Sequence, residues 1–326
     1  MDFDKGFEWR TVDPMRLSPE AEALTKAANP LGPLADLPGI WQGHGFNVIW
    51  RPHQVGLPGD PPNQDRFLEL NLTEETLQFT RIPGAIPNRG LLQPDINLFG
   101  VHYLQQITDR ILKAGIHAEP GVWATVPVTT DPKEPTSVVR MASIPHGTTI
   151  NAQGTALTVT GGPDIKSTSI KPFPIGNPGK PIDFPEQTLA TATKFRFPQP
   201  PQLSEIQQSI VDNPNSVLTD AIKGQKITKT VVLVIDTNPI PTPPFPNNVS
   251  FVKNSGGTDN ISFLVGSNDG PNALAAEMSA IFWIETVDDP GKPPFLQLQY
   301  TQTVSLNFRG LTWPHVSVAT LRKVHA

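Results

Sequence analysis

The sequence predicts an all-β protein, an antiparallel up-and-down β-barrel interrupted by one inserted loop-helix segment. Three observations support this fold class. Short runs of alternating, β-branched residues recur along the chain, and clusters of Pro, Gly, Asn and Asp separate them. The 37 Pro and 25 Gly residues lie between these runs rather than in one tract. Clear helical periodicity occurs in one internal segment, between two proline-rich turns and the next strand.

Composition restricts the classes of function. A chain of 326 residues can form one large β domain. The net charge of −5 argues against a nucleic-acid partner, and the absence of Cys removes thiolate catalysis, zinc–thiolate sites and disulfides. The N-terminus lacks a signal-peptide pattern, and no run approaches the ~18 apolar residues of a membrane span. We therefore expect a cytoplasmic protein without a membrane span.

The chain begins with an N-terminal extension, residues 1–29, in which Ser18-Pro19 is typical of the start of a short helix. Residues 30–326 are expected to form a single β-barrel domain. Its predicted strands are Gly39–Trp50, Phe67–Asn71, Leu77–Arg81, Gly100–Ile107, Gly121–Val128, Ser137–Ile144, Thr148–Val159, Thr188–Phe197, Lys229–Asp236, Ile261–Gly266, Ala276–Val287, Phe295–Phe308 and Val316–Val324.

The segment from about residue 161 to residue 226 breaks the strand rhythm. It opens with Gly161-Gly162-Pro163 and holds the helical pattern at Leu203, Ile206 and Ile210. Its apolar residues are too few for a separate core. We expect an insertion that lies over one end of the barrel and controls access to it.

The strand that ends the chain carries the most informative residue, His315. Alternation places His315, Ser317, Ala319 and Leu321 on one mostly apolar face. An imidazole there is either a core histidine that donates to a carbonyl or an axial ligand to a haem iron. The residues alone leave both interpretations open.

Three motifs in the right order resemble the nitrobindin family, which has a fatty-acid-binding-protein-like (lipocalin-like) barrel. The first is Gly-x-Trp-x-Gly-x-Gly at 39–45, and the second is Gly-Ile-His-Ala-Glu-Pro-Gly-Val-Trp at 115–123. The third is the final hairpin, with Leu-Gln-Tyr at 298–300 and Pro-His-Val-Ser-Val at 314–318. The resemblance covers roughly 34–160 and 229–324. It implies that His315 binds the iron of haem b and that the protein reacts with nitric oxide or peroxynitrite. His44 replaces the family's acidic residue, and alternation from Trp41 predicts that it is exposed.

Further candidate residues would bind the ligand. Trp41 is expected to cap the closed end of the barrel, and Trp123 and Tyr300 belong to motifs of the resemblance. His117 shares a face with Glu119, most simply as a surface ion pair. His146 lies at a hairpin tip that can fold over the pocket mouth. In the strand 276–287, Met278 to Ile284 alternate as the core face, so its glutamates, Glu277 and Glu285, are expected to be solvated.

The leading prediction is a barrel that binds an apolar small molecule, with haem as the first candidate. One alternative is a haem-free carrier of a fatty acid or terpenoid-like ligand. Another is a cofactor-free enzyme that uses a pocket His or Glu for proton transfer on an apolar small molecule. No catalytic residue is assigned, and a homodimer is a candidate assembly.

Overall fold

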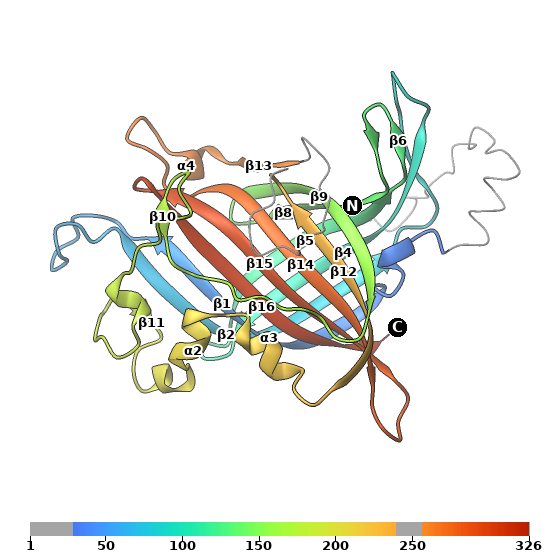
Figure 1. The fold of residues 1–326 in the computed structure, drawn as a ribbon. Coiled ribbons are helices and arrows are strands. Elements are labelled where there is room, and N and C mark those ends of the chain that lie inside the picture. The colour runs from blue at the N-terminus through green and yellow to red at the C-terminus, as the bar shows by residue number, and fades with distance from the viewer. Residues whose placement is uncertain (1–28, 239–255, 326) are drawn as a thin grey trace, which may run out of the picture.

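The computed structural model describes residues 29–238 and 256–325, and the strands within these ranges close into a ten-stranded antiparallel β-barrel (Figure 1). Each strand pairs with the next along the chain, and the last pairs with the first, so the topology is up-and-down. The predicted N-terminal helix lies outside the described residues. The barrel strands are β1 (Gly39–Pro52), β2 (Arg66–Arg81), β4 (Ile96–Asp109), β5 (Ala114–Val126), β8 (Ser137–Ile144), β9 (Thr148–Thr160), β12 (Lys226–Asp236), β14 (Leu274–Asp288), β15 (Phe295–Phe308) and β16 (Leu311–His325).

The predicted closure of the barrel is confirmed by the pairing of β1 with β16 over Ile40–Val48. The motif glycines have a clear role there. A Cβ atom on Gly43 would lie 2.1 Å from the carbonyl oxygen of Thr320, and one on Gly45 would lie 2.1 Å from that of Val318. Only glycine allows the two backbones to approach this closely where the sheet curves.

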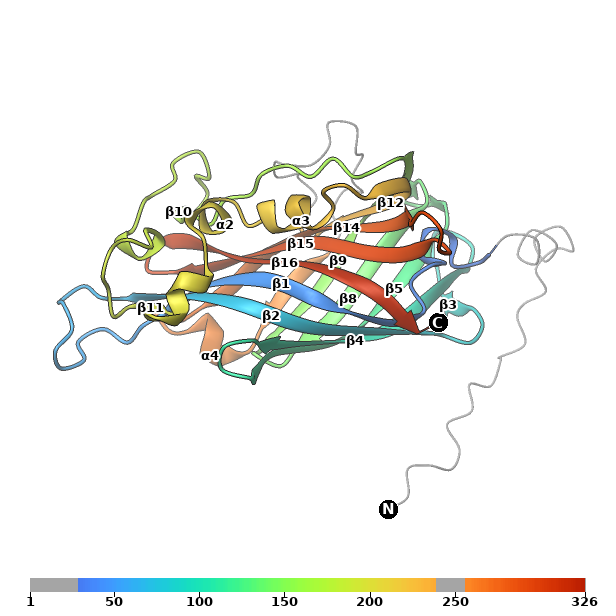
Figure 2. The same cartoon turned by 90° about the horizontal axis from the view of Figure 1, so that it is seen from below.

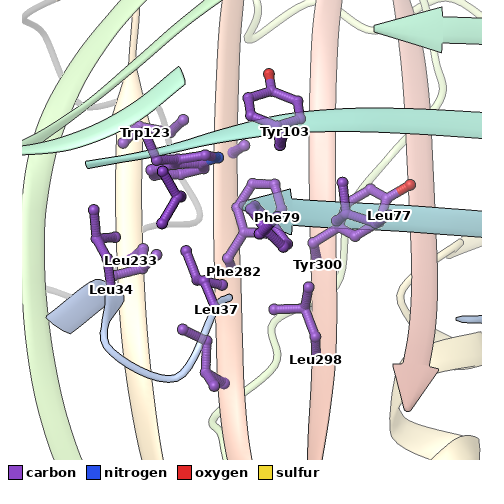
Figure 3. Close-up of a cluster of buried hydrophobic side chains, with 14 of the residues drawn as sticks. Leu34, Leu37, Leu77, Phe79, Tyr103, Trp123, Leu233, Phe282, Leu298 and Tyr300 are labelled. Carbon is purple, nitrogen blue, oxygen red and sulfur yellow. The ribbon is translucent and has the colours of Figure 1, made fainter. Parts of the chain in front are cut away.

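The closed end of the barrel holds Trp41, as expected. Leu34 and Leu37, in and after the 3-10 helix η1 (Gly32–Leu34), enter this end and pack on it (Figure 3). The indole N–H of Trp41 donates to the carbonyl oxygen of Leu37 at 2.8 Å. The segment before β1 therefore acts as a plug.

The insertion packs along the outer wall of the barrel, which corrects the expectation that it covers one end (Figure 2). Val211 and Leu218 of the insertion join a cluster with Trp283, Trp313 and Val316 from outward-facing positions of the strands. It comprises β10 (Phe173–Pro174), η2 (Pro185–Gln187), β11 (Arg196–Phe197), η3 (Gln202–Glu205), α2 (Gln208–Asp212) and α3 (Ser216–Ala221).

Some predicted elements were wrong. Residues 188–197 form a loop that ends in the two-residue β11, because Arg196 there donates to four carbonyl oxygens of residues 186–191. Residues 261–266 contain a short helix, α4 (Ser262–Val265), and the runs 67–71 and 77–81 belong to the single strand β2. The remaining elements are β3 (Ile86–Asn88), β6 (Thr129–Thr130), β7 (Lys133–Glu134) and β13 (Gly257–Asn260). Among the described helices, none has the length and apolar character needed to cross a membrane.

Candidate functional site

A layer of polar side chains crosses the barrel lumen and divides it into two halves. We call it the polar layer. The half on the plug side is the closed half, and the half that ends at the β8–β9 turn with His146 is the open half. The polar layer consists of Glu75, Tyr103, Gln105, Glu119, Arg140, Tyr300 and Gln302.

Arg140 is the centre of the polar layer. From β8 it donates to the Tyr103 hydroxyl at 2.8 Å, to a Glu119 carboxylate oxygen at 2.5 Å and to Gln302 Oε1 at 2.6 Å. Because Gln302 is on β15, which is not a neighbour of β8, this last bond spans the lumen. The guanidinium carbon also lies 5.3 Å from the ring centre of Phe282. This buried cation is therefore held by hydrogen bonds and aromatic rings together.

Glu119 supplies the charge that balances Arg140. Burial alone would raise the pKa of its carboxyl, but the Arg140 charge and hydrogen bonds from its neighbours outweigh burial and lower the pKa to about 2. Tyr103 also donates to this carboxylate. Glu119 is fully buried, so the expectation of a surface ion pair with His117 is corrected, although His117 Nε2 does lie 3.3 Å from Glu119 Oε2.

A second carboxyl in the layer, Glu75, behaves in the opposite way. Burial raises its pKa to about 7, although it accepts hydrogen bonds from the Tyr300 hydroxyl and from Gln105 Nε2, both at 2.7 Å. Two buried carboxyls with pKa values on opposite sides of the ordinary value are typical of sites that separate a charged group from a neutral one. The layer therefore holds one fixed anion and one titratable group.

The two halves differ in the residues that line them and in how their ends are closed. In the closed half, Trp41, Trp123, Leu298 and Leu321 expose at most 1% of their surface. On the other side of the polar layer, Met278, Ala280 and Ile235 are also buried, but several further inward-facing residues keep some surface accessible. Ile107, Ala142, Ile144, Gln302 and Ser317 expose 5–9%, and Val304, His117 and His315 are only half-buried.

His315 faces the lumen, as expected from its strand. Burial first, and then the nearby His117 and His146, lower its pKa to about 3, so the imidazole is neutral at physiological pH. Its Nε2 lies 2.9 Å from Nδ2 of Asn47. An amide nitrogen only donates, so Nε2 accepts and the proton of the neutral ring is on Nδ1. The described residues offer Nδ1 no hydrogen-bond partner.

His117 and His146 lie together at the rim of the open half. Their ring centres are 5.6 Å apart. Gly147 allows the tip to turn with φ +110°, and its carbonyl oxygen accepts from Ile261 N just before α4 at 2.9 Å. The β8–β9 turn therefore places His146 at the rim of the open half, as predicted from its hairpin, and the side chain remains exposed.

The predicted site residues fall into three groups. Trp41 and Trp123 are packed in the closed half, Tyr300 belongs to the polar layer, and His117, His146 and His315 border the open half. His44 is exposed, as predicted. Glu285 is fully buried under the insertion, which corrects the expectation that it is solvated; burial raises its pKa to about 7.

Sequence reasoning missed Arg140, Glu75 and Gln302. Arg140 had a signal, because it lies between Val138 and Ala142 on the face of β8 that alternation assigns to the interior. Glu75 had none, because the sequence placed it between two separate strands.

The residues around His315 do not fit an axial haem ligand in this arrangement. Iron needs an unprotonated ring nitrogen. Nε2 already accepts from Asn47, and Nδ1 carries the proton. No group of three or more His, Asp or Glu side chains within the described ranges is placed to hold a metal ion. Haem ligation by His315 stays a prediction.

The hollows that the described residues form lie at the plug end and on the outside of the barrel. One hollow lies beside η1, where inward-facing Val138, Ala156 and Val231 meet Thr136 and Lys229, and another crosses the outer face of β1, β2 and β4. A small hollow of about 40 Å³ lies between the insertion and the wall, lined by Asn215 and Thr301. Its size suits a few water molecules rather than a ligand. The open half of the lumen is the candidate site because His117, His146 and His315 meet the polar layer there.

Comparisons with known proteins show no family for this chain. No family model and no curated protein matches the sequence. Among solved structures, the chain is similar to Rv2717c from M. tuberculosis, with 11% identity and a TM-score of 0.38 over 90% of this chain and 98% of that chain. A likeness this weak carries no argument about a ligand. The protein is an antiparallel β-barrel whose lumen could bind a ligand, and the nitrobindin resemblance stays a prediction.

Proposed function

We propose that the protein is a haem-free binder of a small apolar molecule, which it holds in the open half of the barrel. The carrying observation is that several inward-facing residues beyond the polar layer, among them Val304 and His315, keep accessible surface at the end where the described residues form no plug. The walls there include Ile107, Ala142, Ile144 and Val304. The polar layer forms the floor of this half, and apolar walls above a polar floor are typical of small-molecule sites.

The electrostatics favour a neutral, terpenoid-like ligand over a fatty acid. The charges of Glu119 and Arg140 balance each other, and Glu75 adds negative charge as it ionises. A carboxylate bound against this floor would meet two buried carboxyls, and like charges in a low-dielectric site repel strongly. The fatty-acid carrier is therefore the less favoured form of the same proposal.

The proposal is tested with a small neutral hydrocarbon, 2-ethylnaphthalene. Titration into the protein, followed by the fluorescence of the probe, should give saturable binding at one site per chain. Protein unfolded in urea is the control, and it should show no saturation. Absence of saturable binding by the folded protein overturns the proposal.

Haem is tested separately, as the ligand that the resemblance implies. If haemin binds through His315, the Nε2 must first lose its hydrogen bond from Asn47, at a cost of about 1 kcal/mol. Asn47→Leu should then strengthen haemin binding, and His315→Ala should abolish the shift of the Soret band. Haemin binding that His315→Ala leaves unchanged would exclude His315 as the ligand.

A further inference from the structure

We propose that the open half contains a recognition site for a carbonyl oxygen, formed by the side-chain amide of Gln302 with the ring of His315, and that the natural ligand is a neutral apolar molecule with a carbonyl group. This inference rests on the proposed function and specifies the chemistry of its ligand.

The orientation of the Gln302 amide is fixed by chemistry. A guanidinium only donates hydrogen bonds, so the atom that meets Arg140 at 2.6 Å must be the oxygen, Oε1. The Nε2 atom therefore points away from Arg140, with two N–H groups. The described residues provide no hydrogen-bond partner for Nε2. Nε2 is also not among the described side-chain atoms that are fully buried and lack a partner, so it keeps some accessible surface. Gln302 is 8% exposed, so this free donor borders the space inside the barrel.

A second donor lies on the neighbouring strand. Gln302 pairs with Ser317, and Val304 pairs with His315, so Gln302 and His315 are diagonal neighbours on the inner face of β15 and β16. The bond from Asn47 uses the lone pair of Nε2, so the free nitrogen of the ring carries a hydrogen. Both unpartnered groups are donors, and neither is a cation.

This donor set selects the ligand. A buried N–H without a partner costs about 1–3 kcal/mol, so a hydrocarbon that displaces water from Gln302 loses that amount. A carbonyl oxygen at the same place restores the hydrogen bond. Because the floor carries no net positive charge to offset a carboxylate, a neutral ketone, ester or quinone fits better than an acid.

Two probes of nearly the same shape test the site, 2-acetylnaphthalene and 2-ethylnaphthalene. The wild-type protein should bind the acetyl compound about five- to tenfold more tightly, since one net hydrogen bond is worth about 1 kcal/mol. The infrared carbonyl stretch of bound 2-acetylnaphthalene should also shift to lower wavenumber than in an alkane solvent. This second measurement needs no variant.

Gln302→Glu removes the N–H donor of Gln302 and tests it separately. The new carboxylate still accepts from Arg140 but presents an oxygen instead of an N–H to the space. The preference for the acetyl compound should disappear or reverse, and the carbonyl band should return toward its position in alkane. Gln106→Glu makes the same change at an exposed position of β4 on the outer face and should keep the wild-type preference.

The outcomes are distinct. Equal affinity for the two probes in the wild type, an unshifted carbonyl band, or a preference that survives Gln302→Glu overturns the carbonyl site and leaves the proposed function in place. If neither probe binds, the proposed function fails, and this inference fails with it.

Discussion

Arg140 shows how single residues shape the lumen. A buried guanidinium and a buried carboxylate each lose hydration, and their attraction roughly offsets that cost. The pair with Glu119 therefore adds little net stability by itself. Arg140 does separate the two halves of the lumen, because its hydrogen bond to Gln302 crosses the barrel as part of the polar layer.

Removing the cation should be strongly destabilising. Arg140→Met leaves the Glu119 carboxylate buried without its charge partner, so we expect the free energy of unfolding to fall by about 3–5 kcal/mol. Urea denaturation followed by tryptophan fluorescence measures the change. Arg81→Met, at an exposed position of β2, serves as the control and should stay near wild type. Equal stability of the two variants would show that Glu119 is not a buried charge.

Glu75 should make stability depend on pH. Its pKa of about 7 lies above its ordinary value of 4.5, so between these values the native state holds a proton that the unfolded state releases. The contribution is complete below pH 4.5 and is lost as the pH rises to 7. Glu75→Gln cannot ionise, so between about pH 5 and pH 8 it should lose on the order of 1–3 kcal/mol less stability than the parent.

The matched control for this experiment is Glu74→Gln. Glu74 lies on the outer face of the same strand, where its side chain is 46% exposed and lies 3.4 Å from Lys113. Its pH profile should follow that of the parent. Glu285 contributes with the same sign in every variant, so the difference between variant and parent isolates Glu75. Parallel profiles for parent and Glu75→Gln would mean that Glu75 is ionised throughout.

At the scale of elements, the plug closes one barrel end, and Trp41 joins the plug to the barrel. Trp41→Ala should lower the free energy of unfolding by about 3–5 kcal/mol, because it opens a large cavity and removes the bond to Leu37. Phe263→Ala, at a 69% exposed position in α4, is the control. A Trp41→Ala variant as stable as this control would refute the assigned role of the plug.

The insertion is the second element with a separable role. It joins β9 to β12, which are adjacent antiparallel strands with Thr160 opposite Lys229. An Asn-Gly turn can replace residues 161–228 without changing the topology. The truncated barrel should bind 2-ethylnaphthalene with the affinity of the parent. It should also self-associate, because the apolar wall around Trp283 and Trp313 becomes exposed.

Sedimentation and probe titration measure these two properties. A monomeric truncated protein that exchanges ligand much faster than the parent would restore the view of the insertion as a lid. If the truncated protein fails to fold, Leu218→Ala in the full-length chain tests the packing of the insertion instead. It removes one buried contact of α3 and should lower the free energy of unfolding by about 2–5 kcal/mol. Ile175→Ala, at a 50% exposed site, is its control.

At the scale of the whole molecule, local patterns predicted the barrel better than the site. The alternation in 315–321 correctly placed His315 inside, and the glycines at 43 and 45 correctly marked the curved first strand. The polar layer could not be predicted, because its bonds join distant residues; Arg140 and Gln302 are 162 positions apart. Glu285 was misassigned because the insertion buries the outer face as well, so both faces of β14 are apolar.

The central claim is that an apolar molecule binds in the open half of the lumen. Ala142 faces that space, whereas its neighbour Met141 is 38% exposed on the outside. The dissociation constant of 2-ethylnaphthalene in wild type, Ala142→Phe and Met141→Phe tests this claim most directly. We predict saturable binding by the wild type and by Met141→Phe, and at least about a 100-fold loss in Ala142→Phe, because a ring occupies the space that the ligand needs. Equal affinity of all three proteins would contradict the claim and place the ligand elsewhere.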